Sequence, residues 1–254
     1  MRASGHATEA AIPVRHRILD WDSEFFGFGV ARIDDPDLTE ADLSAALREL
    51  AGGGVTLVYW PARRELGREV GERLGGVLAD VKVTFAMDLA HTGPSDDADD
   101  AGVESWDESM PVRDVESLAT QSGEYSRFAR DPRFPREKFV ALYDLWIRRS
   151  LRKEIADEVL VIRDSGRVAG MVTLGNKGGR GDIGLIAVDA SSRGRRYGER
   201  LVRAAQRWFA RRGYRSVQVV TQLANAPACG LYRKCGYAVE SVEYFHHFWL
   251  QRTS

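Results

Sequence analysis

The stretch Val188–Gly198 reads VDASSRGRRYG and says more about the fold than any other part of the sequence. It joins an apolar, strand-like segment over 183–188 to a basic turn containing glycine, and then to a helix. That helix has an apolar stripe of helical period, formed by Leu201, Val202, Ala205, Trp208 and Phe209. The first amides of a helix lack partners within it, and the helix dipole favours negative charge, so this turn suits a phosphate group.

Six residues of the turn are candidates for holding such a phosphate: Arg193, Gly194, Arg195, Arg196, Tyr197 and Gly198. The glycines allow close approach of the backbone, and the arginines add charge. No G-K-[ST] follows, so the turn is not a P-loop, and the full dinucleotide glycine pattern is absent. From these residues alone, a basic turn that binds nothing is an equally good interpretation.

The segments around the turn predict a mixed α/β domain. Residues 159–162 and 168–174 form a predicted hairpin, 183–188 and 216–221 are predicted strands, and 226–234 is a predicted helix. Two further helices are predicted from Asp114 and over 135–151, and 237–250 reads as a closing strand pair. The first half of the chain predicts a short α/β unit with helices over 37–50 and 64–74 and strands over 55–60 and 81–89.

Composition divides the chain at one place. Residues 91–107 are acidic, contain Pro and Gly, and show no apolar periodicity, so we expect a linker there. The expected organisation is a disordered N-terminus over 1–14, a small α/β domain over 15–90, the linker over 91–107, and a larger domain over 108–254.

The overall composition excludes several classes of protein. Lys and Arg number 36 against 37 Asp and Glu, which gives a net charge of −1 and a pI of about 6.5. This balance argues against a nucleic-acid partner. No apolar run approaches the roughly 20 residues of a membrane helix, and 1–13 lacks a signal-peptide core. The two cysteines, Cys229 and Cys235, have no metal-ligand spacing, and His246–His247 has no third ligand nearby in sequence. We therefore expect a cytoplasmic protein that binds no metal.

Downstream of the turn, residues 225–237 read NAPACGLYRKCGY. This resembles the motif N-x-x-A-x-x-L-Y-x-x-x-G-[FY] of the GNAT superfamily, the acetyl-CoA-dependent N-acetyltransferases. The turn resembles their pyrophosphate motif [QR]-x-x-G-x-[GA] at Arg193 and Gly198. It departs from it at the fourth position, where Arg196 replaces the usual Gly. The two motifs at this separation extend the resemblance over about 112–250.

The resemblance implies the fold and the co-substrate. The expected fold class is α/β (α+β): a GNAT fold with a central mixed, mostly antiparallel sheet flanked by helices, preceded by a smaller α/β domain. The expected co-substrate is acetyl-CoA, and the partner is a small-molecule amine. We also consider a homodimer. For Arg196, the resemblance leaves two arrangements: a side chain that points outward or meets a phosphate oxygen, or a distorted turn with weaker cofactor binding.

A closer similarity covers the whole chain. Residues 21–26 (WDSEFF), Ser126–Phe128, the helix containing Trp146 and the Asn225/Tyr232 pair are similar to bacterial dTDP-fucosamine acetyltransferases, the amino-sugar enzymes of surface-polysaccharide synthesis. The acceptor implied is a nucleotide-linked amino sugar.

The resemblance also implies roles for individual residues. Tyr232 is the candidate general acid that protonates the leaving thiolate, or else a helix residue packed on the sheet. Asn225 hydrogen-bonds the pantetheine arm, caps the helix, or does both. Leu185, Ile186 and Val188 lie on the strand expected to line that arm, where a bulge separates it from its neighbour.

The acceptor side is less well defined by the sequence. Glu24 is a candidate base or ammonium-positioning group, and Glu124, Asp144 or a water chain are alternatives. Arg127, Phe128 and Arg130 are candidates for binding a nucleotide-sugar diphosphate by charge and stacking, and a solvated loop explains them equally well.

Three functions remain open from the sequence. The first is acetyl transfer to a nucleotide-linked amino sugar. The second is the same chemistry on another amine, such as an antibiotic, a polyamine or a protein N-terminus. The third is a non-catalytic module that binds CoA.

Overall fold

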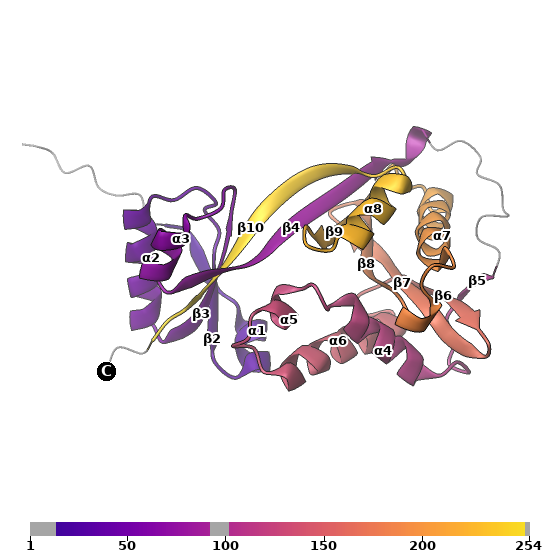
Figure 1. Ribbon diagram of the computed structural model, residues 1–254, viewed down its shortest axis with the longest axis horizontal. Coiled ribbons are helices and arrows are strands. Elements are labelled where there is room, and N and C mark those ends of the chain that lie inside the picture. Colours follow the sequence, from indigo (N-terminus) through magenta and orange to yellow (C-terminus); the bar gives the residue numbers. More distant parts are fainter. Residues whose placement is uncertain (1–13, 92–101, 252–254) are drawn as a thin grey trace, which may run out of the picture. The chain divides into compact units, whose positions relative to one another are not determined.

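A computed structural model of the chain describes residues 14–91 and 102–251. The expected disordered N-terminus, apart from residue 14, and most of the expected linker lie outside these ranges. The chain forms two compact units, shown in Figure 1. Unit 1 comprises Met1–Leu78 and Tyr244–Ser254, and unit 2 comprises Ala79–Glu243. Strands β4 (Gly76–Asp88) and β10 (Ala238–Trp249) each run through a boundary between the units.

Unit 1 is a small α/β arrangement. Its elements are β1 (His16–Ile18), α1 (Asp20–Phe26), β2 (Gly29–Ile33), α2 (Glu40–Gly52), β3 (Val55–Ala62), α3 (Arg68–Arg73) and the last part of β10. Strand β2 pairs with β1 antiparallel and with β3 parallel, and β3 pairs with β10 antiparallel. This arrangement agrees with the α/β character predicted for the first half of the chain.

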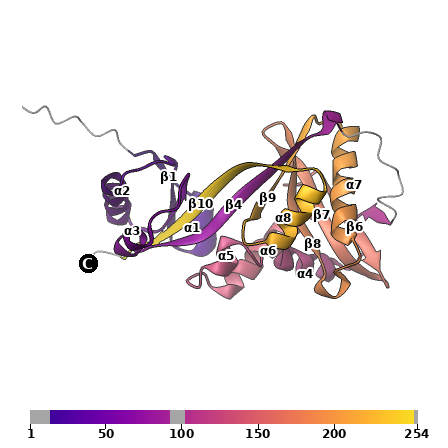
Figure 2. The same cartoon turned by 45° about the horizontal axis from the view of Figure 1, so that its top comes forward.

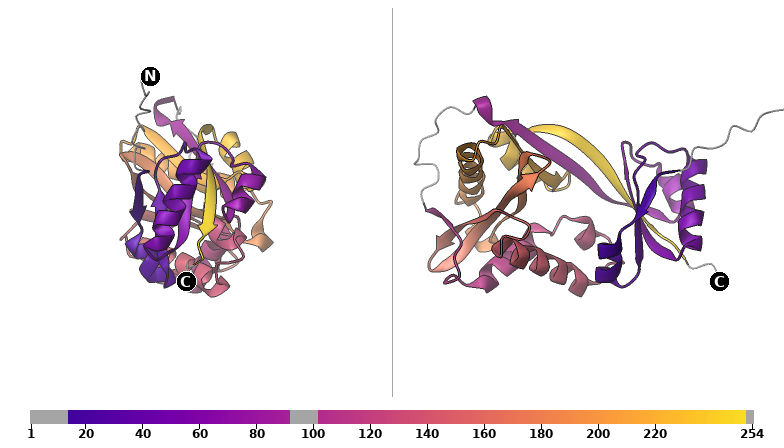
Figure 3. Two further views of the ribbon diagram at one scale, coloured as in Figure 1. Left: turned by 90° about the vertical axis from the view of Figure 1, so that its left-hand side faces the viewer. Right: turned by 180° about the vertical axis from the view of Figure 1, so that it is seen from behind.

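Helix α2 shows why this segment is helical. Thr39 caps it by accepting a hydrogen bond from the Asp42 amide at 3.2 Å. Its apolar residues recur at three- and four-residue spacings and are buried against β3 and Phe248. Figure 3 shows α2 lying along the strands of this unit.

Unit 2 holds the larger sheet, with strand order β4-β9-β8-β7-β6-β5. Its remaining elements are η1 (Leu89–His91), β5 (Val103–Ser105), α4 (Val112–Ser122), α5 (Arg127–Arg130), α6 (Arg136–Leu151), β6 (Glu158–Asp164), β7 (Arg167–Lys177), β8 (Arg180–Val188), η3 (Ala190–Ser192), α7 (Tyr197–Arg211), β9 (Ser216–Gln222) and α8 (Ala226–Lys234). All of the pairs are antiparallel except β8 with β9. This is the mixed, mostly antiparallel sheet that the sequence predicts.

Helices cover both faces of this sheet. The apolar stripe of α7 is buried with α8 and with alternate residues of the strands, among them Phe85, Ile162 and Val219. Figure 2 shows α7 and α8 on one side of the strands and α4 and α6 on the other. Of the described helices, none is long and apolar enough to cross a membrane.

Two features differ from the sequence-based picture. Residues 238–249 form one uninterrupted strand, so the expected strand pair over 237–250 is wrong. No turn-forming residue interrupts VESVEYFHHFW, and β-branched and aromatic side chains favour continuous strand. The compact units also divide the chain elsewhere than at 91–107, because β4 belongs largely to unit 2. The expected domain boundaries stay a prediction.

Candidate active site

The parallel strands β8 and β9 separate within unit 2. Their pairing covers Gly181, Asp182 and Ile183 of β8 and ends where Ile183 lies opposite Val219. On the other side of β8, the register with β7 shifts between Val172 and Leu174. Within this bulge the Thr173 hydroxyl accepts a hydrogen bond from the Leu185 amide at 2.8 Å. The bulge turns the second half of β8 away from β9.

The separation leaves backbone groups of β8 available. The amides of Leu185 and Asp189 both point toward β7, on Thr173 and on the Ala169 carbonyl at 2.8 Å. Because alternate residues of a strand direct their backbone groups to opposite edges, Ile186 and Val188 direct theirs to the edge that β9 has left. The Val188 carbonyl accepts a bond from Arg193 Nε there, at 3.4 Å.

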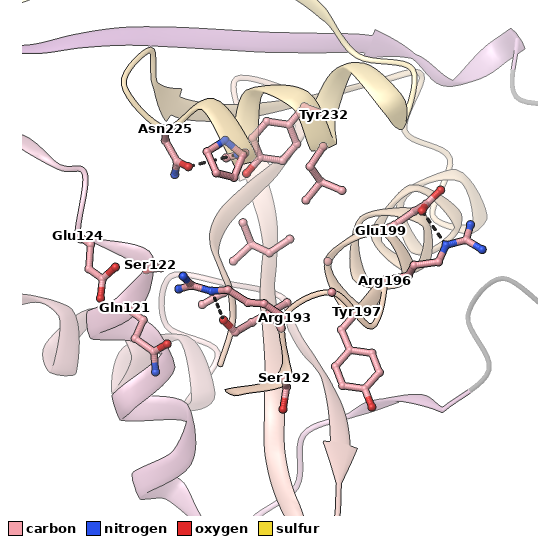
Figure 4. Close-up of a pocket in the computed structure, with 18 of the residues that line it drawn as sticks. Gln121, Ser122, Glu124, Ser192, Arg193, Arg196, Tyr197, Glu199, Asn225 and Tyr232 are labelled. Atoms are coloured by element: carbon pink, nitrogen blue, oxygen red, sulfur yellow. Dashed lines mark hydrogen bonds and ion pairs between the residues drawn. The ribbon is translucent and has the colours of Figure 1, made fainter. Parts of the chain in front are cut away.

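A cavity of about 490 Å³ lies at this separation, entirely within unit 2. Its walls come from the end of α4, the second half of β8, the 192–198 turn, the first turn of α7, and α8, as Figure 4 shows. Nine residues expected from the sequence line it: Ile186, Val188, Arg193, Gly194, Arg196, Tyr197, Gly198, Asn225 and Tyr232. Leu185 and Arg195 do not line it, because the Leu185 amide is bonded to Thr173 and the Arg195 guanidinium pairs with Asp164.

The turn at the base of α7 has the geometry of an anion site. Helix α7 begins at Tyr197, and the side chain of its N-cap residue, Arg196, makes no capping hydrogen bond. The first amides of α7 therefore remain available to a ligand. A Cβ atom added at Gly198 would lie 3.2 Å from Leu231, so glycine allows α7 and α8 to approach closely here.

The backbone explains the residue at which the turn departs from the family motif. Arg196 has φ 61°, in the left-handed region, where glycine carries no steric penalty and other L-residues pay about 1–2 kcal/mol. The turn therefore keeps a conformation suited to glycine although Arg occupies the position. Figure 4 shows the Arg196 side chain directed to Glu199, whose carboxylate accepts a bond from Nε at 3.2 Å.

Glu199 is a buried acid that the sequence did not single out. Its side chain is 8% exposed, lies in the first turn of α7 and lines the cavity. Lys234 Nζ at 2.6 Å and Arg196 Nε at 3.2 Å contact the same oxygen, Oε2, and Arg203 Nε lies 3.7 Å from Oε1. Hydrogen bonds from Lys234 and Arg196 lower the pKa of Glu199 to about 2. Glu199 is thus ionised at neutral pH.

Tyr232 and Asn225 come to the cavity from α8. Tyr232 is 2% exposed, with its ring centroid 5.6 Å from that of Phe85 and 6.0 Å from that of Tyr237. Burial raises the pKa of Tyr232 well above its ordinary value, so the phenol stays protonated. Asn225 Oδ1 accepts a bond from the Ala228 amide at 3.2 Å, which is its capping role, and its Nδ2 group is the part that can donate to a ligand.

The wall opposite α8 is polar. It is formed by Gln121, Ser122, Glu124 and Tyr125 at the end of α4. Gln121 Nε2 donates to Asp189 at 3.2 Å and so ties α4 to the loop after β8. The buried Oε1 atom of Gln121 has no hydrogen-bond partner in the described part of the chain. Figure 4 shows Glu124 beside it, and the Glu124 side chain is exposed.

The expected acceptor-binding residues lie just beyond this wall and do not line the cavity. Phe128 is 6% exposed, with ring centroids 5.4 Å from Phe134 and 6.3 Å from Trp146. The Arg127 guanidinium lies 4.2 Å from the Phe128 ring centroid, and Arg130 is exposed. Phe128 is therefore packed against protein neighbours. Glu24 is exposed on α1 of unit 1.

Among the described residues, no three His, Cys, Asp or Glu side chains are grouped so that they could hold a metal ion. The chemistry of the cavity is therefore assigned to the protonated Tyr232, the amides of the turn, the carboxylate of Glu124 and the cations around Glu199.

Comparison with known proteins defines the class. Residues 122–237 match the acetyltransferase (GNAT) family, so the chain carries a GNAT acetyltransferase domain and is an N-acetyltransferase. Among solved structures, a GCN5-related N-acetyltransferase from Sphaerobacter thermophilus superposes with a TM-score of 0.62 at 19% identity, over 91% of this chain and 75% of that one. A GCN5-related N-acetyltransferase from Kribbella flavida gives 0.54 at 14% identity, over 86% and 80%.

Curated relatives are similar in sequence. The chain is 29% identical to a dTDP-fucosamine acetyltransferase of Escherichia coli over 95% of this chain and 100% of that protein. It is 27% identical to the spore coat polysaccharide biosynthesis protein SpsD of Bacillus subtilis over 52% of this chain and 45% of that protein.

Acetyl-CoA is the acetyl donor of this class. The residues present fit it. The uncapped start of α7 suits phosphates, and the unpaired edge of β8 suits the amide groups of a pantetheine arm.

Proposed function

We propose that the protein transfers an acetyl group from acetyl-CoA to the amino group of a nucleotide-linked amino sugar. The observation that carries this proposal is the length of the similarity to the dTDP-fucosamine acetyltransferase. It spans all of that relative and 95% of this chain, whereas the match to the acetyltransferase family covers only 122–237. Unit 1, no part of which falls within 122–237, is therefore shared with an enzyme named for this type of acceptor.

In this proposal the turn and β8 bind the donor. The first amides of α7 and the side chain of Arg193 face its diphosphate, at the end of the helix that carries the positive dipole. The unpaired backbone groups of Ile186 and Val188 hydrogen-bond the pantetheine arm, and Asn225 Nδ2 donates to it from the opposite wall. Acetyl-CoA supplies an acetyl group activated as a thioester.

Tyr232 is the general acid. An amine that attacks the thioester carbonyl forms a C–N bond as the C–S bond breaks, and the departing sulfur requires a proton. The Tyr232 phenol holds that proton because burial disfavours its ionised form. The position of Tyr232 on the cavity wall between Leu231 and the turn of α8 allows it to act there.

Carboxylates serve the amine. Glu124 lines the cavity wall opposite α8, and we propose that it binds the acceptor ammonium and receives its proton directly or through water. Gln121 Oε1, buried and lacking a protein partner in the described structure, accepts a second hydrogen bond from the acceptor. Glu24, on α1 of unit 1, is the second candidate for the base. Comparison of Glu124→Gln with Glu24→Gln assigns the role.

Arg127 and Arg130 provide charge for the diphosphate of the acceptor. They follow directly on the wall residues Glu124 and Tyr125, and guanidinium groups bind phosphate in a bidentate manner. The buried ring of Phe128 supports the Arg127 guanidinium that lies over it.

A panel assay tests the proposed acceptor. Thiol release from acetyl-CoA is followed with dTDP- and UDP-linked amino sugars, streptothricin-type antibiotics, polyamines and peptide N-termini. We expect turnover with at least one nucleotide-linked amino sugar and background rates with the others. Preferential turnover of an antibiotic, a polyamine or a peptide would contradict the proposal.

A further inference from the structure

The ion network around Glu199 leaves a surplus of positive charge at the cavity. One buried carboxylate is surrounded by Arg196, Lys234 and Arg203, which is one negative charge against three positive charges. The Arg196 and Lys234 side chains are 70% and 59% exposed, and both residues line the cavity. A charge-balanced clamp between α7 and α8 would need only one of these cations.

The two cations are also held close together. Both contact the same oxygen of Glu199, Oε2, at 3.2 Å and 2.6 Å. Two like charges repel at such a separation unless an anion lies between them. Glu199 therefore fixes Arg196 and Lys234 as a pair, and their exposed donors can be engaged by a single further anion of high charge.

The donor carries two kinds of phosphate. Its diphosphate has one negative charge on each phosphorus, and the uncapped amides and dipole of α7 suit such a group. Its ribose 3′-phosphate is a monoester, which carries a charge of about −1.5 to −2 at neutral pH. A pair of cations matches the monoester better than the diphosphate, because the amides of the turn already serve the diphosphate.

We propose that Lys234 and Arg196 bind the 3′-phosphate of acetyl-CoA and that Glu199 is the residue that positions them. The pair selects acetyl-CoA against donors that lack this phosphate. The proposal also gives a role to the arginine at the usual glycine position of the turn, since the left-handed backbone at Arg196 brings its side chain to Glu199. It rests on the acetyl-CoA donor of the domain and is independent of the acceptor.

Calorimetric binding to the full-length protein tests this proposal without any acceptor. Dissociation constants are measured for CoA and for 3′-dephospho-CoA. Wild-type protein should bind CoA more tightly by on the order of tenfold to 100-fold, as expected for charge-assisted hydrogen bonds. Equal affinity for the two ligands would overturn the proposal with no variant required.

Variants separate the 3′-phosphate from the diphosphate. Lys234→Met should weaken CoA binding by about tenfold and leave the binding of 3′-dephospho-CoA unchanged. Lys177→Met is the matched control, because Lys177 lies at the end of β7 and does not line the cavity. An equal loss for both ligands would assign Lys234 to the diphosphate, and no loss for either would leave it a link between helices. Both results contradict the proposal.

The positioning role of Glu199 has its own test. Glu199→Gln makes the site more positive, so an effect of charge alone would tighten CoA binding. Loss of positioning should instead reduce the preference for CoA over 3′-dephospho-CoA, with CoA bound more weakly. Lys234→Arg, which keeps the charge, should retain most of the preference. A preference that is unchanged or increased in Glu199→Gln would refute the positioning role.

Discussion

Burial of one phenol links the packing of single residues to the proposed chemistry. Tyr232 is 2% exposed between Phe85 and Tyr237, and this environment raises its pKa. A general acid needs a proton to give at neutral pH, and a buried tyrosine on a cavity wall retains one. The same packing allows the hydroxyl to be removed without disturbing the ring.

Tyr232→Phe should therefore lower kcat by on the order of 10²-fold with little change in the affinity for acetyl-CoA. Steady-state kinetics with saturating donor, together with calorimetry of CoA binding, measure the two effects separately. Wild-type turnover by the variant would show that Tyr232 is structural and that another group protonates the leaving sulfur.

Asp80 is a second residue whose environment controls its charge. Burial raises its pKa to about 6, although Arg127, the side chain of Gln222 and Lys82 all act to lower it. The unfolded chain ionises this carboxyl near pH 3.8, and the folded protein resists ionisation until about pH 6. The protonated carboxyl thus favours the folded state at low pH, and this contribution is lost as the pH rises from about 4 to above 6.

Asp80→Asn should remove this loss. We expect the free energy of unfolding at pH 7 to increase by up to about 3 kcal/mol, the equivalent of roughly two pKa units, and to match wild type below about pH 4. Urea denaturation across this pH range provides the measurement. A variant less stable than wild type at pH 7 would show that the ionised carboxylate is stabilising through Arg127.

At this scale the sequence predicts some site residues and misses others for a physical reason. Asn225, Tyr232 and the turn over 193–198 stand within short local motifs, so spacing alone brings them to attention. Glu199 and Lys234 are 35 residues apart and meet only because α7 and α8 pack side by side. An isolated Glu in the first turn of a helix is ordinary, and its three cationic neighbours are visible only in three dimensions.

At the scale of elements, the separation of β8 from β9 creates the site. The bulge opposite Thr173 ends the pairing at Ile183, and the cavity forms beyond that point. A Cβ atom added at Gly184 would lie 2.8 Å from Thr173 Oγ1, so this glycine gives the hydroxyl room to reach the Leu185 amide. A single side-chain hydroxyl thus supports the irregular part of the sheet.

Thr173→Val keeps the shape of the side chain and removes the acceptor. The Leu185 amide then loses its partner, which should cost about 1–3 kcal/mol of stability. The KM for acetyl-CoA should rise as well, because the edge of β8 that faces the cavity is less well fixed. Thr173→Ser is the control, since it retains the hydroxyl and should lie between the two. A Thr173→Val variant with wild-type stability would show that the bulge does not depend on this bond.

The type of most elements is predictable from sequence, and irregular pairing is not. Periodicity indicates α2, α6 and α7 because each buries an apolar stripe, and β-branched runs indicate β3, β6 and β9. The bulge in β7 arises from pairing with a different strand, which the run VAGMVTL does not reveal. The closing segment fails for a related reason: a strand pair and one long strand have the same side-chain pattern.

At the scale of the whole molecule, the two units divide the chain at points that composition does not mark. The acidic run suggests a boundary, yet β4 precedes it and contributes Val83 and Phe85, 1% and 0% exposed, to the core of unit 2. Strand β4 is placed by its pairing with β9, more than 120 residues later in the chain. Such distant pairing leaves no trace in local composition.

This organisation predicts how fragments behave. The fragment 79–243 retains the cavity and the whole core of unit 2, so it should fold and bind CoA within about tenfold of the affinity of the full chain. The fragment 108–254 loses β4 and β5 and should fail to form a cooperatively folded domain. Circular dichroism and calorimetry compare the two. Tight binding by 108–254 and none by 79–243 would place the boundary at the acidic run instead.

The central claim is that the acceptor is an amino sugar carried on a nucleotide, and one ratio tests it most directly. The kcat/KM of the full-length enzyme is measured for a dTDP-linked amino sugar and for the same amino sugar without the nucleotide, at saturating acetyl-CoA. Because binding energy from the nucleotide and its diphosphate can be used to orient the amine, we predict a ratio of about 100 or more. A ratio near one, or a higher value for the free amino sugar, would contradict the account.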